Sequence, residues 1–442
     1  MPPVQFLPFP LFLHRGLSIV KDARTQVYSL GPGVLTFRCN VGTELKIEKL
    51  VYGGDGLARL EGEVIFVPYV LPGELVTAER IGARKHVQRA QLTGVVEPSA
   101  DRTEPPCPIF GSCGGCQYQH ANYESQLRFK REILAETLRR TAKLEFDPEK
   151  ITTVPSQPYG YRNRAQFHFE NGQVGYREMG SNKLVPAAQC PISSPKLNEV
   201  LTGLNRMVRD RRWPRFLESL EAFTDERNVQ WNVMESDRPV AKHFFEWLAE
   251  EIPGTVLGPL DYLVNNDEFR VSGQSFFQVN RFLVSSMDEW AIGSARGESA
   301  WDLYAGVGLF SLPLARRFQK VTAVEGGRAA AADLERNARR AGLQISAVQQ
   351  QTAEFLAAAR TAPEFVLADP PRSGLEKAVT GHLLRLRPKE LVIVACDPAT
   401  LARDLGVLAA GYEVESLTIL DLFPQTFHIE TVARLIAKET AA

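Results

Sequence analysis

Two different spacings of hydrophobic and polar residues divide the 442-residue chain. From Gly42 to about Pro98, apolar and polar residues alternate in short runs that glycine and proline interrupt. The clearest runs are Leu45–Leu50, Glu63–Val67 and Glu74–Ala78. Several short strands at close spacing are typical of a small β-barrel. We therefore predict a barrel over residues 42–99, preceded by an irregular leader over residues 1–41.

From about Gly297 onward, short apolar runs alternate with segments rich in alanine and arginine. The predicted strands are Ala300–Leu303, Lys320–Val324, Phe365–Ala368 and Leu391–Ala395, and the clearest predicted helix is Arg328–Ala341. Strands that alternate with helices are typical of a doubly wound parallel sheet. We expect a Rossmann-like α/β domain over residues 291–442. Residues 100–290, which mix strands and helices, form the predicted central domain.

A glycine-containing turn, Asp302–Gly308, follows the first of these strands. Glycines let the backbone turn tightly and approach a ligand at the carboxyl edge of a sheet. Glu325 ends the next strand, where an acid can accept hydrogen bonds from both ribose hydroxyls of an adenosine. The third glycine of the dinucleotide-binding pattern is replaced by Ser311, which favours a methyltransferase over an NAD enzyme. Asp369, followed by two prolines, adds a fixed carboxylate at the same edge.

Cys396 ends the last of the predicted strands. Asp397 and Pro398 follow it and suit the cap and first turn of a helix. A thiol beside a helix N-terminus is expected to have a lowered pKa, and nucleophilic attack requires thiolate character. A single cysteine at a strand end is also commonly a buried apolar residue. Its predicted place near the glycine turn and Asp369 favours the nucleophile.

A thiolate has a specific use in pyrimidine chemistry. Addition of sulfur to carbon 6 of uracil makes carbon 5 nucleophilic enough to take a methyl group from a sulfonium. A base must then remove the carbon 5 proton so that the thiolate can leave. Glu430, near the carboxyl terminus, is the predicted base. His428 is the alternative, because imidazole titrates close to neutral pH.

Three of the six cysteines lie close together in the sequence. Cys107, Cys113 and Cys116 have glycines between them, and Cys190 follows farther along the chain, before a proline. Glycines let a loop wrap a compact centre, and four thiolates suit an iron–sulfur cluster or zinc. The residues predict a metal centre, and their spacing leaves its identity open.

The net charge of −1 does not indicate a nucleic-acid partner, but two segments are basic. Residues 80–96 carry four cations and no carboxylate, and residues 126–143 carry six cations against two acids. A solvated basic face accounts for such runs as well as RNA binding does. No apolar run is long enough to span a membrane, and Pro8 and Pro10 interrupt the apolar start. We expect a cytoplasmic protein without membrane contact and without an obligate protein partner.

From about Gly42 to Arg434 the chain resembles the RNA uracil-C5 methyltransferase family, in particular its iron–sulfur-containing 23S ribosomal RNA branch. Besides the four-cysteine pattern, the stretches that carry the resemblance are Gly53–Gly56, Gly273–Asn280, Asp302–Gly308, Ala368–Pro370, Cys396–Asp404 and His428–Glu430. The resemblance implies an N-terminal TRAM domain, which is an OB-like barrel, and a [4Fe-4S] cluster on the four cysteines. It also implies methyl transfer from S-adenosylmethionine to C5 of a uridine in RNA.

The resemblance assigns roles residue by residue. The family's cofactor contacts correspond to Gln278, Tyr304, Glu325 and Asp369, of which the first two rest on resemblance alone. Cys396 corresponds to the nucleophile and Glu430 to the base. The chain departs from the family at Asp397, where Asn is common, and at Leu309, where an Asn can help bind the cofactor.

Three alternatives remain beside methylation of 23S ribosomal RNA. The tRNA-modifying branch typically lacks both the barrel and the cluster, so ribosomal RNA is favoured over tRNA as the partner. A non-catalytic RNA-binding or redox-sensing iron–sulfur protein would not need Glu325, Asp369, Cys396 and Glu430 together. Transfer to C5 of cytosine uses a similar thiolate and stays open.

Overall fold

The structure, a computed structural model, describes residues 18–22, 25–29, 37–39, 42–84 and 87–439. The chain forms two compact units. The first consists of Met1–Lys49 and Gly56–Ser99, and the second of Leu50–Asp55 and Ala100–Ala442. Among the described residues, every helix is too short or too polar to span a lipid bilayer.

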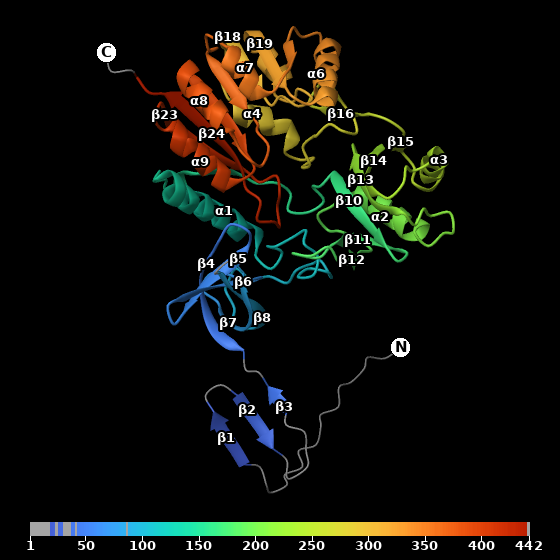
Figure 1. The fold of residues 1–442 in the computed structure, drawn as a ribbon, viewed down its shortest axis with the longest axis vertical. Coiled ribbons are helices and arrows are strands. Elements are labelled where there is room, and N and C mark those ends of the chain that lie inside the picture. Colours follow the sequence, from blue (N-terminus) through green and yellow to red (C-terminus); the bar gives the residue numbers. More distant parts are fainter. Residues whose placement is uncertain (1–17, 23–24, 30–36, 40–41, 85–86, 440–442) are drawn as a thin grey trace. The chain divides into compact units, whose positions relative to one another are not determined.

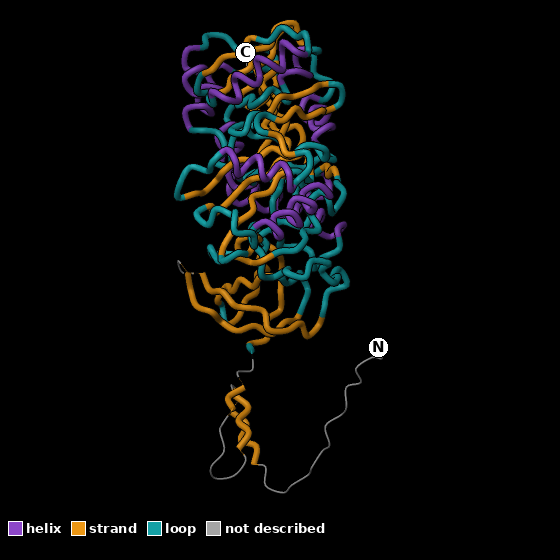
Figure 2. The backbone as a smooth tube through the Cα atoms, turned by 90° about the vertical axis from the view of Figure 1, so that its right-hand side faces the viewer, coloured by secondary structure: helices purple, strands orange, loops and turns teal. Residues whose placement is uncertain are grey.

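The first unit contains a closed five-stranded barrel, in the order β4-β5-β6-β8-β7. Its strands are β4 (Thr43–Leu50), β5 (Asp55–Leu60), β6 (Glu63–Pro68), β7 (Leu75–Arg84) and β8 (Val87–Glu97). Alternate residues such as Leu45, Ile47 and Ile65 point into its core, as the sequence pattern predicts. The predicted OB-like barrel is confirmed, and in Figure 2 the described part of this unit contains strands and loops without a helix.

Part of the expected irregular leader contains strands. β1 (Ser18–Asp22), β2 (Thr25–Ser29) and β3 (Phe37–Cys39) form an antiparallel sheet, and the other residues up to 41 lie outside the described ones. The expectation of an irregular leader was therefore wrong for these segments. Runs of five residues or fewer are too short to show a clear period, although they contain good strand formers such as Val20 and Tyr28.

An eight-stranded sheet dominates the second unit, in the order β20-β19-β18-β21-β22-β24-β23-β9. Its strands are β9 (Thr152–Val154), β18 (Gly297–Leu303), β19 (Phe318–Glu325), β20 (Ser346–Gln349), β21 (Phe365–Ala368), β22 (Glu390–Ala395), β23 (Tyr412–Leu420) and β24 (Glu430–Ala437). The predicted strands and the Rossmann-like fold are confirmed. The five strands from β18 to β22 run parallel, whereas β24 is inserted antiparallel between β22 and β23.

Helices connect and cover this sheet (Figure 1). They are α4 (Met287–Ile292), α5 (Ser311–Ala315), α6 (Arg328–Arg340), α7 (Thr352–Ala358), α8 (Lys377–Leu386) and α9 (Pro398–Leu408). Earlier in the chain lie α1 (Tyr123–Thr137), the π-helical turn η1 (Leu138–Ala142) and the 3-10 turns η2 (Pro148–Lys150) and η3 (Val284–Ser286). β9 joins the eight-stranded sheet beside β23, although it lies in the predicted central region.

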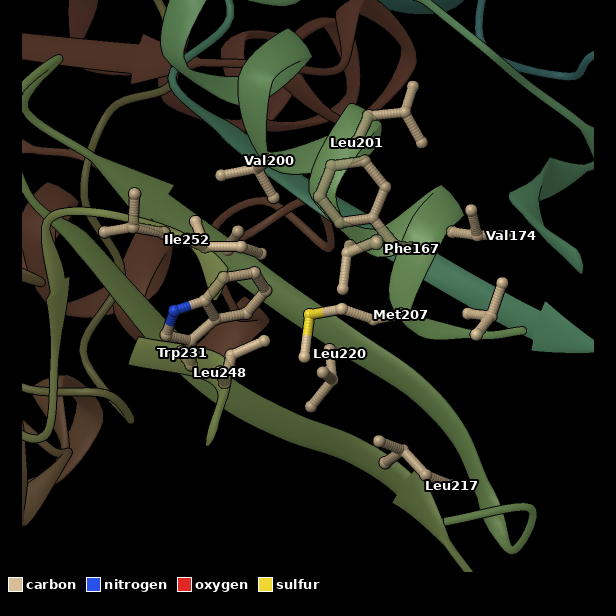
Figure 3. Packing of buried hydrophobic residues seen from close by; sticks show 14 of the residues in the cluster. Phe167, Val174, Val200, Leu201, Met207, Leu217, Leu220, Trp231, Leu248 and Ile252 are labelled. Atoms are coloured by element: carbon tan, nitrogen blue, oxygen red, sulfur yellow. The ribbon is translucent and has the colours of Figure 1, made fainter. Parts of the chain in front are cut away.

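A second sheet of the second unit has the order β12-β11-β10-β13-β14-β15. Its elements are β10 (Arg164–Glu170), β11 (Gln173–Arg177), β12 (Leu184–Pro186), β13 (Leu217–Thr224), β14 (Val229–Ser236), β15 (Thr255–Val256), α2 (Pro195–Met207) and α3 (Lys242–Glu251). Figure 3 shows Phe167, Leu220 and Trp231 from its strands packed with Leu201 and Leu248 from its helices. The hairpin β16 (Leu260–Val264) and β17 (Asp267–Val271) follows it.

The sheet topology brings three segments that are distant in sequence to one edge. β21 and β22 are parallel neighbours that end at Ala368 and Ala395, so the residues after them leave at the same edge. Because β24 is antiparallel to β22 and pairs Ala395 with Thr431, it begins at that edge with Glu430. Ligands of open α/β sheets bind outside the carboxyl ends of the strands.

Candidate active site

The turn after β18 begins at a buried carboxyl. Asp302 accepts a hydrogen bond from the Ser311 hydroxyl. Its pKa is raised to about 7 because it is buried, with a further rise from the charges of Asp369 and Glu325. Three acids therefore face a common region where β18, β19 and β21 end, and a cationic ligand would offset their mutual repulsion.

Glu325 holds the shape of this turn. One oxygen accepts a hydrogen bond from the Gly306 N–H at 2.8 Å, and the other accepts from the Gly327 N–H at 2.6 Å. Carboxylate oxygens have about four acceptor sites, so ribose hydroxyls can still donate to it. Tyr304 and Gly306 have φ of 61° and 55°, and a Cβ added at Gly306 would meet no atom within 4 Å. The turn therefore faces open space of the kind that a bound cofactor needs.

Asp369 lies at the end of β21, beside this turn. Its backbone N–H donates to the Leu303 carbonyl at 3.2 Å, and burial raises the pKa of its carboxyl to about 7. Gln278 follows β17 and is buried, and its backbone carbonyl accepts a hydrogen bond from the Asn163 side chain at 3.3 Å. These contacts fix the backbone at both positions.

Cys396 is half-buried at the end of β22. The expectation that the helix N-terminus lowers its pKa was wrong: the pKa is raised to about 12 by burial, and the charges of Glu430 and Asp369 add to the rise. Arg372 lowers it only in part. Desolvation and two nearby carboxylates disfavour a negative sulfur more than the end of one helix favours it. In the free protein the thiol therefore keeps its proton at neutral pH.

Glu430 and His428 differ strongly as bases. Glu430 is buried, and its pKa is raised well above the ordinary range by burial and by the charge of Asp369. His428 has its pKa lowered to about 4 by burial and by the charges of Arg372 and other cations, and its ring packs on Phe427 with centroids 4.3 Å apart. A raised pKa strengthens a base and a lowered one weakens it, so Glu430 is favoured.

Two side chains that received no role from the sequence lie at this site. Arg372 is exposed, and its charge lowers the pKa of both Cys396 and Glu430. Its place in the Asp-Pro-Pro-Arg stretch after β21 was the available signal. Burial raises the pKa of the Tyr52 phenol, and the charges of Asp397 and Cys396 add to the rise, so Tyr52 lies near both residues. Its position directly before the glycine turn Gly53–Gly56 gave no indication of that.

Contacts from α1 and from the residues that follow the cysteine loop hold the segment that leads to Glu430. Gln126 of α1 exchanges two hydrogen bonds with Gln425, at 3.0 and 2.9 Å. The backbone N–H groups of Gln117 and Tyr118, next to the cysteine loop, donate to the Gln425 carbonyl at 3.0 and 2.9 Å. Lys130, fully buried on α1, donates to Asp421 at 2.6 Å. These contacts order the chain between β23 and β24.

The four predicted metal ligands lie on two segments that are distant in the sequence. All five cysteines in the part of the chain with described side chains are free thiols. Cys116 and Cys190 lie in one apolar cluster. Burial raises the pKa of Cys107, Cys113 and Cys116, and the charge of Cys190 adds to each rise. A cation would offset the unfavourable ionisation of neighbouring thiols. Among the described residues, however, no group of three or more histidine, cysteine, aspartate or glutamate side chains is placed so that it could hold a metal ion.

The basic segments are largely paired where the structure describes them. On α1, Arg128 contacts Asp101 at 2.5 Å and Arg131 contacts Glu149 at 3.3 Å. In the barrel, Arg80 contacts Glu63 at 2.9 Å, whereas the side chains of residues 83–87 lie outside the described ones. Ion pairs with nearby acids neutralise part of this positive charge, so RNA binding is not needed to explain that part.

Comparison with known proteins gives consistent matches. The family described as tRNA (Uracil-5-)-methyltransferase matches residues 261–438, and the TRAM domain matches residues 42–93. An uncharacterized RNA methyltransferase of Aquifex aeolicus is 34% identical over 425 residues, which cover 90% of this chain and 99% of the relative. The 23S rRNA (uracil(1939)-C(5))-methyltransferase RlmD of Halomonas elongata is 34% identical over 448 residues, covering 90% of each chain.

One solved structure shares the fold over most of the chain. It is the crystal structure of Pyrococcus abyssi tRNA (uracil-54, C5)-methyltransferase in complex with S-adenosyl-L-homocysteine. The TM-score is 0.73 at 24% sequence identity, and the match covers 89% of this chain and 99% of the other.

Proposed function

The chain belongs to the family of RNA uracil-C5 methyltransferases that carry a TRAM domain, and from this premise we propose that Cys396 and Glu430 perform the chemistry and that 23S ribosomal RNA is the substrate. The enzyme uses S-adenosylmethionine as the methyl donor. The observation that carries the chemical proposal is the antiparallel insertion of β24, which starts at Glu430 on the edge where β22 ends before Cys396. The charge of Glu430 raises the pKa of the Cys396 thiol, which agrees with this placement.

We assign the cofactor to the turn after β18. Glu325 would accept from the ribose hydroxyls, and Tyr304 and Gln278 would line the same space. The buried carboxyl of Asp369 would bound the site on its far side. When bound, S-adenosylmethionine supplies an electrophilic methyl group. The acids of this site suit its positively charged sulfonium.

The nucleophile and the base act on the uracil ring. After the Cys396 thiol has released its proton to solvent, its sulfur would form a bond to C6. The electron pair that this shifts to C5 would then form the bond to the methyl carbon, while the methyl–sulfur bond of the donor breaks and leaves a neutral thioether. The Glu430 carboxylate takes the proton from C5, and the S–C6 bond breaks to restore the ring double bond and the thiolate. Protonation of Asp369 removes one of the charges that hold the thiol pKa high, while Arg372 continues to lower it. The target base must leave its stack for this attack.

Replacement of Cys396 tests the covalent mechanism. Cys396→Ala is expected to abolish methyl transfer and the stable adduct with 5-fluorouridine RNA, while S-adenosylmethionine still binds by calorimetry. Cys39→Ala, in the first unit of the chain, serves as the control. Formation of 5-methyluridine by Cys396→Ala would refute the proposal.

The choice of RNA rests on the Halomonas relative and on the barrel. Mass spectrometry of digested ribosomal and transfer RNA from a strain lacking the gene should show one missing 5-methyluridine in 23S ribosomal RNA. Loss from tRNA instead would favour the tRNA alternative, and a missing 5-methylcytidine would favour cytosine. We place the reaction in the cytoplasm, where RNA is modified and thiols stay reduced.

We propose further that Cys107, Cys113, Cys116 and Cys190 hold a [4Fe-4S] cluster that orders the loop and supports RNA binding. Support comes from the four thiols being free and from Cys116 and Cys190 lying in one apolar cluster. Cys113→Ser is expected to lose bound iron and the visible absorption and to bind RNA more weakly, whereas Cys396→Ser keeps the iron. Stoichiometric zinc without iron in the wild-type protein would refute the cluster.

A further inference from the structure

One residue in the loop between β23 and β24 has an unusual backbone conformation. Gln425 lies five residues before Glu430, and its φ is +69°. Glycine adopts such a left-handed conformation freely, whereas a residue with a Cβ does so only at a cost that the surrounding structure must offset. Gln425 is buried, with 2% of its surface exposed, so its polar groups need partners within the protein. Those partners hold the conformation.

The first partner is Gln126 on α1, which is fully buried. Its Oε1 accepts from the backbone N–H of Gln425 at 2.9 Å, and its Nε2 donates to the side-chain Oε1 of Gln425 at 3.0 Å. The same Nε2 donates to the carbonyls of Ala121 at 2.9 Å and Tyr118 at 3.2 Å. A flipped amide would turn its oxygen toward these carbonyls. The amide of Gln126 therefore has one orientation, in which Oε1 meets the Gln425 N–H.

The second set of partners follows Cys116 in the chain. The backbone N–H groups of Gln117 and Tyr118 donate to the Gln425 carbonyl at 3.0 and 2.9 Å. Both polar backbone groups of Gln425 are thus paired with residues outside its own loop. A return to an ordinary negative φ would turn the N–H and the carbonyl relative to each other, so both sets of hydrogen bonds could not persist.

The residues between Gln425 and Glu430 are also ordered. The Thr426 hydroxyl accepts from the His428 N–H at 3.2 Å and donates to the Phe423 carbonyl at 2.9 Å. Directly after this loop β24 begins with Glu430, which pairs with the last residue of β23. A change in the direction of the chain at Gln425 therefore moves the start of β24.

We propose that Gln126 is a positioning residue for the base: its reciprocal hydrogen bonds hold Gln425 in the left-handed conformation and thereby set where the Glu430 carboxylate meets the C5 proton. The proposal rests on Glu430 being the base. A base acts only within hydrogen-bonding reach of the proton that it takes, and a misplacement of about 1 Å can cost roughly 10²-fold. Attack by Cys396 and methyl transfer precede this step and do not need the Glu430 carboxylate.

The test separates placement of the base from loss of stability. Gln126→Met keeps the length of the side chain and removes its hydrogen bonds. Gln425→Gly lets the backbone adopt this φ without support, so in that background the conformation no longer needs Gln126. The matched control is Gln166→Met, which removes an amide on β10 that donates to the Ser219 hydroxyl at 3.0 Å.

Each enzyme is mixed with methyl-labelled S-adenosylmethionine and total RNA from a strain that lacks the gene. The label is followed over time in the protein–RNA adduct on denaturing gels and in released RNA. Gln126→Met is expected to release methylated RNA about 10–100-fold more slowly than the wild type and to accumulate the methylated adduct. The label should enter the adduct at the wild-type rate, and the KM for S-adenosylmethionine should not change.

The double variant Gln126→Met with Gln425→Gly should release RNA within about threefold of the wild-type rate and accumulate no adduct, because the cost of the left-handed conformation is gone. Gln166→Met should accumulate none either. Slow release that Gln425→Gly does not restore would overturn the proposal. So would an equal slowing of methyl transfer and release, or a lower midpoint of thermal unfolding with unchanged release.

Glu430→Gln is run in parallel. An adduct with Glu430→Gln but none with Gln126→Met would overturn the positioning role and leave the base in place. The absence of an adduct with Glu430→Gln would refute the base itself, on which the role of Gln126 depends.

Discussion

The buried carboxyl of Asp369 should make the free enzyme less stable as the pH rises. Burial raises its pKa from 3.8 to about 7 in the folded state. Below pH 3.8 the folded and unfolded chains both hold the proton, so the ionisation of this carboxyl does not lower the free energy of unfolding. As the pH rises toward 7 only the unfolded state ionises, and the free energy of unfolding falls until it levels off. At 1.36 kcal/mol per pKa unit, the total loss is at most about 4 kcal/mol.

Asp369→Asn removes this loss while it keeps the size of the side chain. Urea unfolding without cofactor should show the variant more stable than the wild type by a margin that grows by about 2–3 kcal/mol between pH 5 and pH 8. The charge of Asp369 also raises the pKa of Asp302. Asp369→Asn therefore lowers that pKa as well, which adds to the greater stability of the variant at high pH. The exposed Asp237→Asn is the matched control and should show no pH-dependent margin. A constant margin, or a variant less stable at pH 8, would refute the reasoning.

Two further predictions concern the base and its support. Glu430→Gln should lower turnover roughly 10²–10⁴-fold and accumulate a methylated protein–RNA adduct on denaturing gels, because the C5 proton has no acceptor; full turnover without adduct would contradict this role. Lys130→Met should destabilise the enzyme by about 3–5 kcal/mol in urea, because it leaves Asp421 buried and unpaired. The exposed pair of Lys242 with Glu246 is the control, and Lys242→Met should cost less than about 1 kcal/mol. An equal loss of stability in the two variants would show that burial of the Lys130–Asp421 pair does not increase its contribution.

Local patterns in the sequence were enough to predict the barrel and the parallel strands and to propose most residues of the candidate site. The strands at Phe365–Ala368 and Leu391–Ala395 are runs of buried apolar residues, and such runs are visible without knowing what covers them. The same holds for the turn Asp302–Gly308, because a strand, a glycine turn and a helix follow one another directly in the chain. The leader strands were missed because their runs are too short to carry a period.

The sequence by itself thus determined the barrel, the parallel sheet and the identity of the chemical groups, since alternation, turn residues and reactive side chains are local properties. Only the tertiary structure decided how these groups act on one another. The insertion of β24 brings Glu430 to the edge where Cys396 lies. Burial and then the charge of Glu430 raise the thiol pKa, which the neighbouring helix alone would lower. Tyr52, far away in the sequence, packs its ring edge to face on Phe427, three residues before Glu430. Desolvation and charge depend on distances between segments far apart in the chain, and those distances exist only in the folded protein.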